Sequence, residues 1–294
     1  MSRVPSGWQA CPLARDSAGM SIDPPSRLLN TLFAVEKTLE ERLRDWLDEQ
    51  GYPLEMVVAR SLRAVGFRVT QGEYYEDPES TGFRELDISA FLADAVEGGL
   101  ARITYVVECK RSREKPWILF TSPPVRMSPV ASVAQRAASE VGQRFLAKLT
   151  RRRDVQNLPA FSIPNRTGYA LTQAFTSKAD VAYAAAASVS DAALAQAKAA
   201  DRDIRMVCEV AFPAVVVDGR LFECYLDAGD EMHISEISSG TLFWRNPILG
   251  VRHTVIQVVT RVALDDFARD AHRSAEFLLE SCRPDWEQAI NEGR

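Results

Sequence analysis

The sequence predicts an α/β protein with a mixed central sheet flanked by helices, an N-terminal helix, and a C-terminal α+β extension. The order of the segments along the chain predicts this class. Segments with apolar residues at helical spacing alternate along the chain with short apolar segments of strand-like composition. Interleaving of this kind favours an α/β arrangement over separate all-α and all-β halves. The 294 residues, 46% of them hydrophobic, can bury a large core, which excludes a disordered protein.

Composition excludes several classes of function. The net charge of -5 argues against a protein that is uniformly basic. The five cysteines are widely spaced and form no CxxC pair, so they indicate neither a disulfide framework nor a zinc site: Cys11, Cys109, Cys208, Cys224 and Cys282. No apolar run approaches the roughly 18 residues that would span a bilayer. We therefore expect a soluble cytoplasmic protein without a membrane partner, and no nucleotide-binding or serine-hydrolase motif is present.

Three regions are expected along the chain. They are a disordered leader (1–25), a core with an N-terminal helix (26–175), and a C-terminal α+β extension packed on the core (176–294). In the core, helical spacing predicts a long helix over 27–50 and a second helix that begins near Pro53 and ends at Gly66. Three strands should follow, over 67–77, 83–94 and 101–112, the last two joined by an "EGG" turn.

The rest of the chain continues the alternation. A Pro-rich loop leads to an expected helix of about twenty residues ending near Leu149, and "TGYALTQAF" reads as another strand. In the extension we expect an Ala-rich helix, then two strands joined by a hairpin turn at Asp218-Gly219. A strand from His253 and an amphipathic helix should complete the chain.

Charged side chains at the ends of two neighbouring strands are the main functional signal. Because successive strand residues point to opposite faces, Glu108 and Lys110 share one face of their strand. The "EGG" hairpin would bring Asp87 of the preceding strand close to Glu108. Burial of two carboxylates and an ammonium costs desolvation free energy unless partners compensate their charges. A Mg²⁺ ion would satisfy both acids, and a lysine beside it could hold or deprotonate an attacking water.

The segments "RELD" and "VVECK", separated by strand and turn, resemble the PD-(D/E)XK nuclease superfamily, which has the restriction-endonuclease-like fold. The resemblance covers about the central third of the chain. It implies a core of helix, three strands, helix and strand over residues 53 to 174. It also implies that Asp87 and Glu108 bind Mg²⁺, or Mn²⁺ as a substitute, together with the Cys109 backbone carbonyl, and that Lys110 lies beside the nucleophilic water. An acid on the first core helix often supports such sites, a role that falls on Glu55.

One residue departs from the family pattern. Leu86 stands where the family has a proline before the aspartate, and that proline carries no metal ligand. Each of these residues also has a purely structural explanation. Asp87 could be an exposed polar residue of its strand, and Glu108 and Lys110 could form an ion pair on the surface. Glu55 could be an acid in the first turn of a helix, where it complements the helix dipole. Trp117 is expected in the core and not in the site.

A basic block begins at the predicted site. Residues 110 to 153 contain eleven Lys or Arg and only two acids. Such a block suits the phosphate backbone of a nucleic acid, with Arg111, Arg113 and Lys115 nearest to the chemistry. We therefore expect a metal-dependent nuclease acting on DNA, in defence or repair by analogy alone.

Two alternatives remain at this point. The first keeps the fold without catalysis, as a module that binds nucleic acid or a protein partner. The second is an interaction protein without a nucleic-acid role, built around the 27–50 helix and the C-terminal hairpin. A homodimer or an accessory protein partner is compatible with each reading.

Overall fold

The computed structural model describes residues 37–77, 82–96, 98–123, 127–176, 180–245 and 253–293. The chain divides into two units, residues 1–43 and 44–294, and the sheet described below lies in the second unit. The predicted leader and the first part of the predicted 27–50 helix lie outside the described residues. Helix α1 (Leu39–Gln50) is the last part of that predicted helix.

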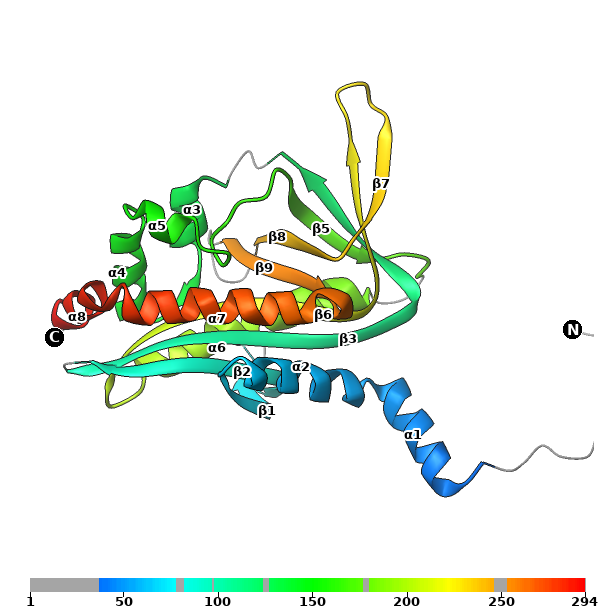
Figure 1. The fold of residues 1–294 in the computed structure, drawn as a ribbon, viewed down its shortest axis with the longest axis horizontal. Coiled ribbons are helices and arrows are strands. Elements are labelled where there is room, and N and C mark those ends of the chain that lie inside the picture. Colours follow the sequence, from blue (N-terminus) through cyan, green and yellow to red (C-terminus); the bar gives the residue numbers. More distant parts are fainter. Residues whose placement is uncertain are drawn as a thin grey trace, which may run out of the picture. The chain divides into compact units, whose positions relative to one another are not determined.

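Three antiparallel strands form one side of the central sheet (Figure 1). They are β1 (Arg68–Glu76), β2 (Phe83–Val96) and β3 (Gly99–Ser122). Strands β2 and β3 form the hairpin expected from the "EGG" turn, with Val96 opposite Gly99. The sequence prediction of these three strands is confirmed. The predicted order of helix and three strands is also confirmed, because α2 (Tyr52–Ala64) precedes them.

Strand β6 (Met206–Leu226) lies parallel to β3 along nearly its whole length, from Gly99 opposite Met206 to Phe120 opposite Cys224. The predicted hairpin at Asp218-Gly219 is therefore wrong, because β6 continues through these residues. Gly219 serves a close approach between strands: a Cβ there would lie 2.3 Å from the Ser112 carbonyl oxygen. The predicted C-terminal extension thus contributes a central strand to the sheet.

Strand β3 contains a large bulge directly after the predicted site. Ser112 pairs with Gly219 and Trp117 pairs with Leu221, so four residues, Arg113 to Pro116, face a single residue of β6. The segment "WILF" is therefore the continuation of β3. Trp117 is completely buried, as predicted.

The long strands β3 and β6 also take part in a closed ring of five strands. Strand β5 (Thr167–Gln173) pairs with β3, and β8 (Ser239–Arg245) pairs with β5. Strand β9 (His253–Thr260) pairs with both β8 and β6 and closes the ring. The short strand β4 (Ala137–Ala138) and strand β7 (Met232–Ile237) pair with the outer edge of β6.

Helices cover both faces of the sheet (Figure 1). One face packs against α2, α4 (Glu140–Leu149), α7 (Leu264–Glu280) and α8 (Arg283–Asn291). The other face packs against the Ala-rich helix α6 (Val181–Asp201), whose small side chains allow close contact with the strands. The three remaining helical turns are α3 (Pro129–Ala134), α5 (Arg153–Gln156) and a 3₁₀ turn (Arg261–Ala263). The fold is thus a large mixed sheet flanked by helices.

The predicted twenty-residue helix ending near Leu149 is wrong, because α3 and α4 are separate helices with β4 between them. Ser128 and Ser139 cap the two helices, each accepting a hydrogen bond from a backbone N–H of the first turn. The second cap is buried, and the Ser139 hydroxyl also donates to the Val207 carbonyl of β6. These caps divide a segment that reads as one helix by spacing alone.

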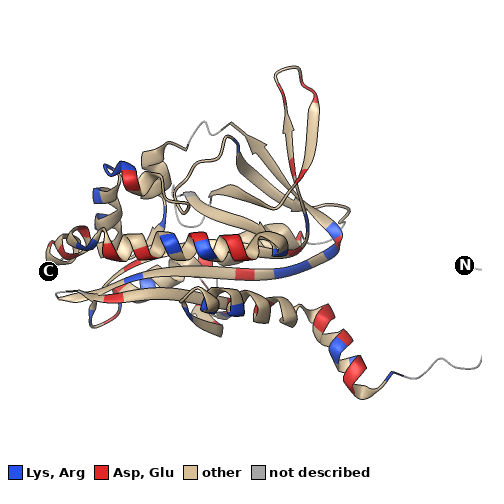
Figure 2. Ribbon diagram, viewed as in Figure 1, with Lys and Arg blue, Asp and Glu red and all other residues tan. Residues whose placement is uncertain are grey.

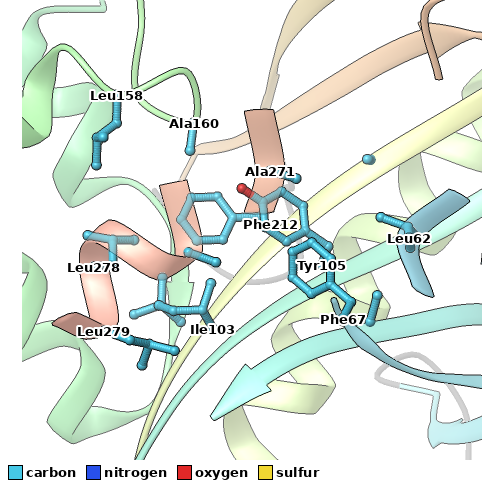
Figure 3. Close-up of a cluster of buried hydrophobic side chains, with 14 of the residues drawn as sticks. Leu62, Phe67, Ile103, Tyr105, Leu158, Ala160, Phe212, Ala271, Leu278 and Leu279 are labelled. Carbon is cyan, nitrogen blue, oxygen red and sulfur yellow. The ribbon is translucent and has the colours of Figure 1, made fainter. Parts of the chain in front are cut away.

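Successive side chains of β3 point to opposite faces of the sheet, as the alternation in the sequence predicts. Ile103 and Tyr105 pack in the core beneath α7 (Figure 3), and Val107 belongs to the same core. Val106 packs in the core beneath α6. Among the helices that the structure describes, none combines the length and the apolar character needed to cross a bilayer. Four cysteines are free thiols and all four are buried: Cys109, Cys208, Cys224 and Cys282.

Candidate functional site

The candidate site lies where β2 and β3 separate. Their ladder runs from the hairpin turn to the Ile88–Val107 pair and ends there, one residue before Asp87 and Glu108 would be opposite each other. At this point the Cys109 backbone N–H donates to the Asp87 carboxylate, with 2.7 Å between N and Oδ2. Beyond the last backbone pair, the Asp87 side chain is therefore the hydrogen-bond acceptor for β3, in place of a backbone carbonyl of β2. We call this point the strand fork.

Strand β2 changes face at the fork, and the sequence does not predict this. Ile88 and Ala90 pack in the α7-side core, whereas Leu86 packs in the α6-side core, so the expected alternation breaks at Asp87. Gly72 of β1 lies at the level of Asp87 in the β1–β2 register and has a φ of 66°. Only glycine adopts this left-handed conformation readily. The local turn of the backbone leaves Asp87 half-buried beside β3.

Glu108 is held from two sides on the α6 face of β3. The residue is only 6% exposed. The Lys110 ammonium lies 2.5 Å from Glu108 Oε1, and the Ser188 hydroxyl of α6 donates to Oε2 at 3.3 Å. The Tyr75 hydroxyl of β1 in turn donates to the Ser188 carbonyl at 3.2 Å. Three elements of the fold therefore fix the position of this carboxylate.

Glu55 joins the cluster from the first turn of α2. Its carboxyl group lies within electrostatic range of Asp87, Glu85, Glu108 and Lys110. Burial, together with the negative charges of Asp87 and Glu85, raises the pKa of Glu55 to about 7. The structure thus brings together the four residues that the sequence singled out. We call Glu55, Asp87, Glu108 and Lys110 the acidic cluster.

The pKa values of the ion pair show which charge dominates the acidic cluster. Burial raises the pKa of Glu108, and Asp87 adds to this effect while Lys110 opposes it. Burial alone would lower the pKa of Lys110, but the Glu108 and Asp87 carboxylates raise it. Lys110 is therefore a protonated ammonium in the ion-free protein. Three carboxylates share one ammonium, which leaves a surplus of negative charge that a divalent cation would neutralise.

Cys109 lies between the two charged residues but faces the other side of the sheet. Its thiol packs in the α7-side core, where burial raises its pKa well above the ordinary value. The thiol is therefore not a nucleophile. The predicted role of the Cys109 carbonyl as a metal ligand stays a prediction, whereas the N–H of the same residue positions Asp87.

Two of the three predicted nucleic-acid contacts are already paired with acids. Arg111 contacts Asp48 at 3.1 Å, and Arg113 contacts Asp48 at 3.0 Å and Asp218 at 2.7 Å. Lys115 lies on the β3 bulge, where its backbone carbonyl accepts a hydrogen bond from the Ser112 hydroxyl at 2.6 Å. A phosphate backbone would have to compete with carboxylates for both guanidinium groups.

The basic block of residues 110 to 153 does not form one surface. Its described members are distributed along the far part of β3 and around α4 and α5, and Figure 2 shows the two groups apart. Arg136 is buried in the core, and Lys148 and Arg152 pair with Glu292 and Asp285. Residues that are neighbours in the sequence of this block therefore lie on different elements, and nucleic-acid contact by Arg111, Arg113 and Lys115 stays a prediction.

Sequence reasoning missed three residues of the site. Glu85 contributes to the field at Glu55, and Tyr75 and Ser188 form the hydrogen-bonded support of Glu108. Glu85 lies two residues before Asp87, a spacing that could have indicated it. Ser188 lies in an Ala-rich helix 80 residues away from Glu108, and no local pattern reveals that contact.

A second group of potential metal ligands lies at the tip of the β6–β7 hairpin. One ligand atom from each of Asp227, Glu231 and His233 lies within 4.8 Å of the others. Asp227 also accepts hydrogen bonds from the backbone N–H groups of Gly229 and Glu231, as in an ordinary turn. We assign this group to the turn.

Comparison of the chain with protein-family models, with curated proteins and with solved structures finds no match.

Proposed function

We propose that the protein is a Mg²⁺-dependent nuclease with a restriction-endonuclease-like core, and that it hydrolyses phosphodiester bonds in DNA. The observation that carries the proposal is the strand fork. There, Asp87 and the Glu108-Cys109-Lys110 segment meet across two separating strands. This placement is the one that the motif resemblance requires.

The order of elements supports the proposed core. Helix α2 precedes the β1–β2–β3 meander, and a helical crossover that includes α6 leads to β6, which is parallel to β3. In this assignment the strand after the crossover is β6, whereas the sequence suggested the strand over 167–175. The latter strand, β5, is antiparallel and pairs with β3 only beyond the bulge.

Each residue of the acidic cluster has a distinct role in the proposal. Asp87 and Glu108, with the Cys109 carbonyl, would hold the ion, and Glu55 would complete its surroundings. The bound Mg²⁺, or Mn²⁺ in its place, would neutralise charge that develops on the phosphate. Lys110 would position the attacking water or take its proton. The Cys109 N–H fixes one oxygen of Asp87, and the Ser188 hydroxyl fixes one oxygen of Glu108. The other Glu108 oxygen contacts the Lys110 ammonium, which a bound ion would have to displace.

Cleavage of nucleic acid tests the proposal directly. The full-length protein is incubated with plasmid, linear and single-stranded DNA and with RNA, in Mg²⁺, Mn²⁺ or EDTA. We expect cleavage of DNA with either metal and none with EDTA. The variants Asp87→Asn and Lys110→Met should reduce the rate by about a hundredfold or more. Asparagine can still accept the Cys109 hydrogen bond, so the fold is retained.

Matched controls come from the same chain. Asp94→Asn is on the same strand as Asp87, and Lys148→Met removes a lysine of a surface ion pair. Both should cleave as the wild type does, because surface pairs contribute little. Equal rates for Asp87→Asn and the wild type would contradict the proposal.

The alternative of an inactive nuclease-fold module gives a different outcome. It predicts DNA binding that weakens with salt, without cleavage by any metal. The ion pairs of Arg111 and Arg113 with Asp48 support a third outcome, in which the protein neither binds nor cleaves nucleic acid. Binding and cleavage measured on the same samples separate the three.

A further inference from the structure

A cavity of about 200 Å³ lies on the face of β3 opposite to Glu108 and Lys110. Its floor contains Tyr105 of β3 and Phe212 of β6, which stack with 5.1 Å between ring centroids and lie side by side in Figure 3. Arg136 and Phe267 also line it, and exposed residues of α7 and of the turn before β8 form its mouth. The cavity is therefore closed by the core and open to solvent on one side.

Arg136 is the unusual residue of this cavity because it is a buried cation. It is 5% exposed, and its guanidinium lies over the rings of Phe161 and Phe212. Its Nε donates to the Ser132 carbonyl at 2.8 Å. Its Nη2 donates to the Ala160 carbonyl at 2.7 Å and to the Ser132 hydroxyl at 3.3 Å.

The remaining nitrogen of Arg136 is poorly satisfied. Nη1 makes one long hydrogen bond, at 3.4 Å, to the Val255 carbonyl. A guanidinium has five N–H groups, and the hydrogen bonds to Ser132, Ala160 and Val255 use four of them. One N–H of Nη1 thus has no acceptor among the described residues.

In the part of the chain that the structure describes, no carboxylate is in contact with the Arg136 guanidinium. Among the described residues it forms no ion pair, and the Tyr105 hydroxyl, neutral at ordinary pH, is the titratable group that acts on it. Burial lowers the pKa of Arg136 to about 10, so the guanidinium is still charged near neutral pH. An unpaired buried charge is costly, and a bound anion would remove this cost.

The mouth of the cavity limits the charge of such an anion. Asp266 and Asp270 of α7 lie at the mouth and are exposed, and each is paired with an arginine one turn away, Arg269 and Arg273. These carboxylates would repel a doubly charged phosphate more strongly than a singly charged group. Phe212 and Phe267 provide apolar walls for an uncharged body.

We propose that this cavity binds a small organic monocarboxylate, with its carboxylate against Arg136 and its apolar part between Phe212 and Phe267. A carboxylate offers two oxygens to the planar guanidinium, which is a geometry that arginine recognises well. The inference does not depend on nuclease activity, because none of the residues of the acidic cluster lines the cavity.

Calorimetric titration of the full-length protein with benzoate, benzamide and inorganic phosphate tests this proposal. We expect saturable binding of benzoate. Benzamide and phosphate should bind at least about tenfold more weakly. Benzamide has no negative charge to interact with Arg136, and doubly charged phosphate is repelled by Asp266 and Asp270. The variant Arg136→Gln should weaken benzoate binding by a similar factor.

A second variant keeps the test decisive if Arg136→Gln does not fold. Ser239→Trp places a large side chain at the exposed mouth and should also abolish benzoate binding. Ser235→Trp, on exposed strand β7 and outside the cavity lining, is its matched control and should bind as the wild type does. Absence of saturable benzoate binding, benzamide binding as tight as that of benzoate, or unchanged binding by Ser239→Trp would each overturn the proposal.

Discussion

Two buried ion pairs lie on the same face of β3, and their surroundings differ. Near the middle of the strand, Lys110 pairs with Glu108 of the same strand. Toward its start, Arg102 pairs with Glu209 of β6, with Arg102 Nε against Glu209 Oε2. Both glutamate side chains are nearly inaccessible to solvent. By burial and charge alone, the two pairs look equivalent.

The difference lies in the number of carboxylates. Glu209 has one guanidinium, and burial raises its pKa to about 7 without a contribution from a second acid. Glu55 reaches the same value, but Asp87, Glu85 and Glu108 contribute to it. A raised pKa by itself therefore does not identify a functional site. A surplus of like charge at a place where two strands separate is the stronger signal.

The largest effect on stability should come from breaking the Arg102–Glu209 ion pair, in which one carboxylate has one guanidinium. Arg102→Ala leaves Glu209 buried and unpaired, so we expect a loss of about 3–5 kcal/mol in the free energy of unfolding. Urea unfolding measures this loss. Cleavage of DNA per folded molecule should be unchanged. A folded Arg102→Ala protein that no longer cleaves would show that the two pairs do not have separate roles.

Mg²⁺ should stabilise the protein only by binding to the carboxylates of the acidic cluster. At a Mg²⁺ concentration ten times the dissociation constant, we expect about 1.4 kcal/mol of added stability. Thermal unfolding with and without Mg²⁺ measures it. The effect should disappear in Asp87→Asn and persist in Glu231→Gln, which alters the acidic group of the β6–β7 hairpin. The opposite pattern would move the metal site to that hairpin.

Removal of one surplus charge should stabilise the ion-free protein in a pH-dependent way. The folded pKa of Glu55, about 7, exceeds its ordinary value of 4.5, so the wild type loses stability as pH rises between these values. Glu55→Gln avoids this loss. We expect a gain of about 1 kcal/mol near pH 8, reduced by solvent screening of the half-buried group, and almost none near pH 4.5. An equal gain at both pH values would exclude the electrostatic explanation.

The smallest effect should come from the support of Glu108. Ser188→Ala removes one long hydrogen bond, of 3.3 Å, to the Oε2 atom of the carboxylate, which we expect to be worth about 1 kcal/mol. We expect a cleavage rate a few-fold lower at saturating Mg²⁺ and a weaker apparent affinity for the ion. Ser190→Ala, a buried serine of the same helix, is the matched control. Identical metal titrations for the two variants would show that Ser188 does not position Glu108.

Local patterns predicted the parts of the fold that depend on nearby residues. The β2–β3 hairpin follows from the "EGG" turn and the alternation of Ile103 to Cys109, and these features bring Asp87 to Glu108. The parallel pairing of β6 with β3 could not be predicted, because it joins residues about 107 positions apart. Asp218-Gly219 taken alone is a strong turn signal. In the structure, Gly219 instead allows the close approach of β6 to Ser112 of β3, a contact that the sequence does not show.

The same limit applies to the site. Glu55, Asp87, Glu108 and Lys110 were predictable because each follows from strand alternation or from the motif resemblance. The acids that neutralise Arg111 and Arg113, and the serine that holds Glu108, belong to elements that reach the site only through tertiary packing. Charge counted along the sequence therefore overestimated the basic surface.

The central claim is that the acidic cluster is a divalent-cation site. Anomalous scattering from crystals soaked in Mn²⁺ tests it most directly, because the signal locates the ion without reference to activity. The claim predicts a peak at the strand fork, within about 2–2.6 Å of carboxylate oxygens of Asp87 and Glu108. A peak only at Asp227 and Glu231, or none at the fork at saturating Mn²⁺, would contradict it.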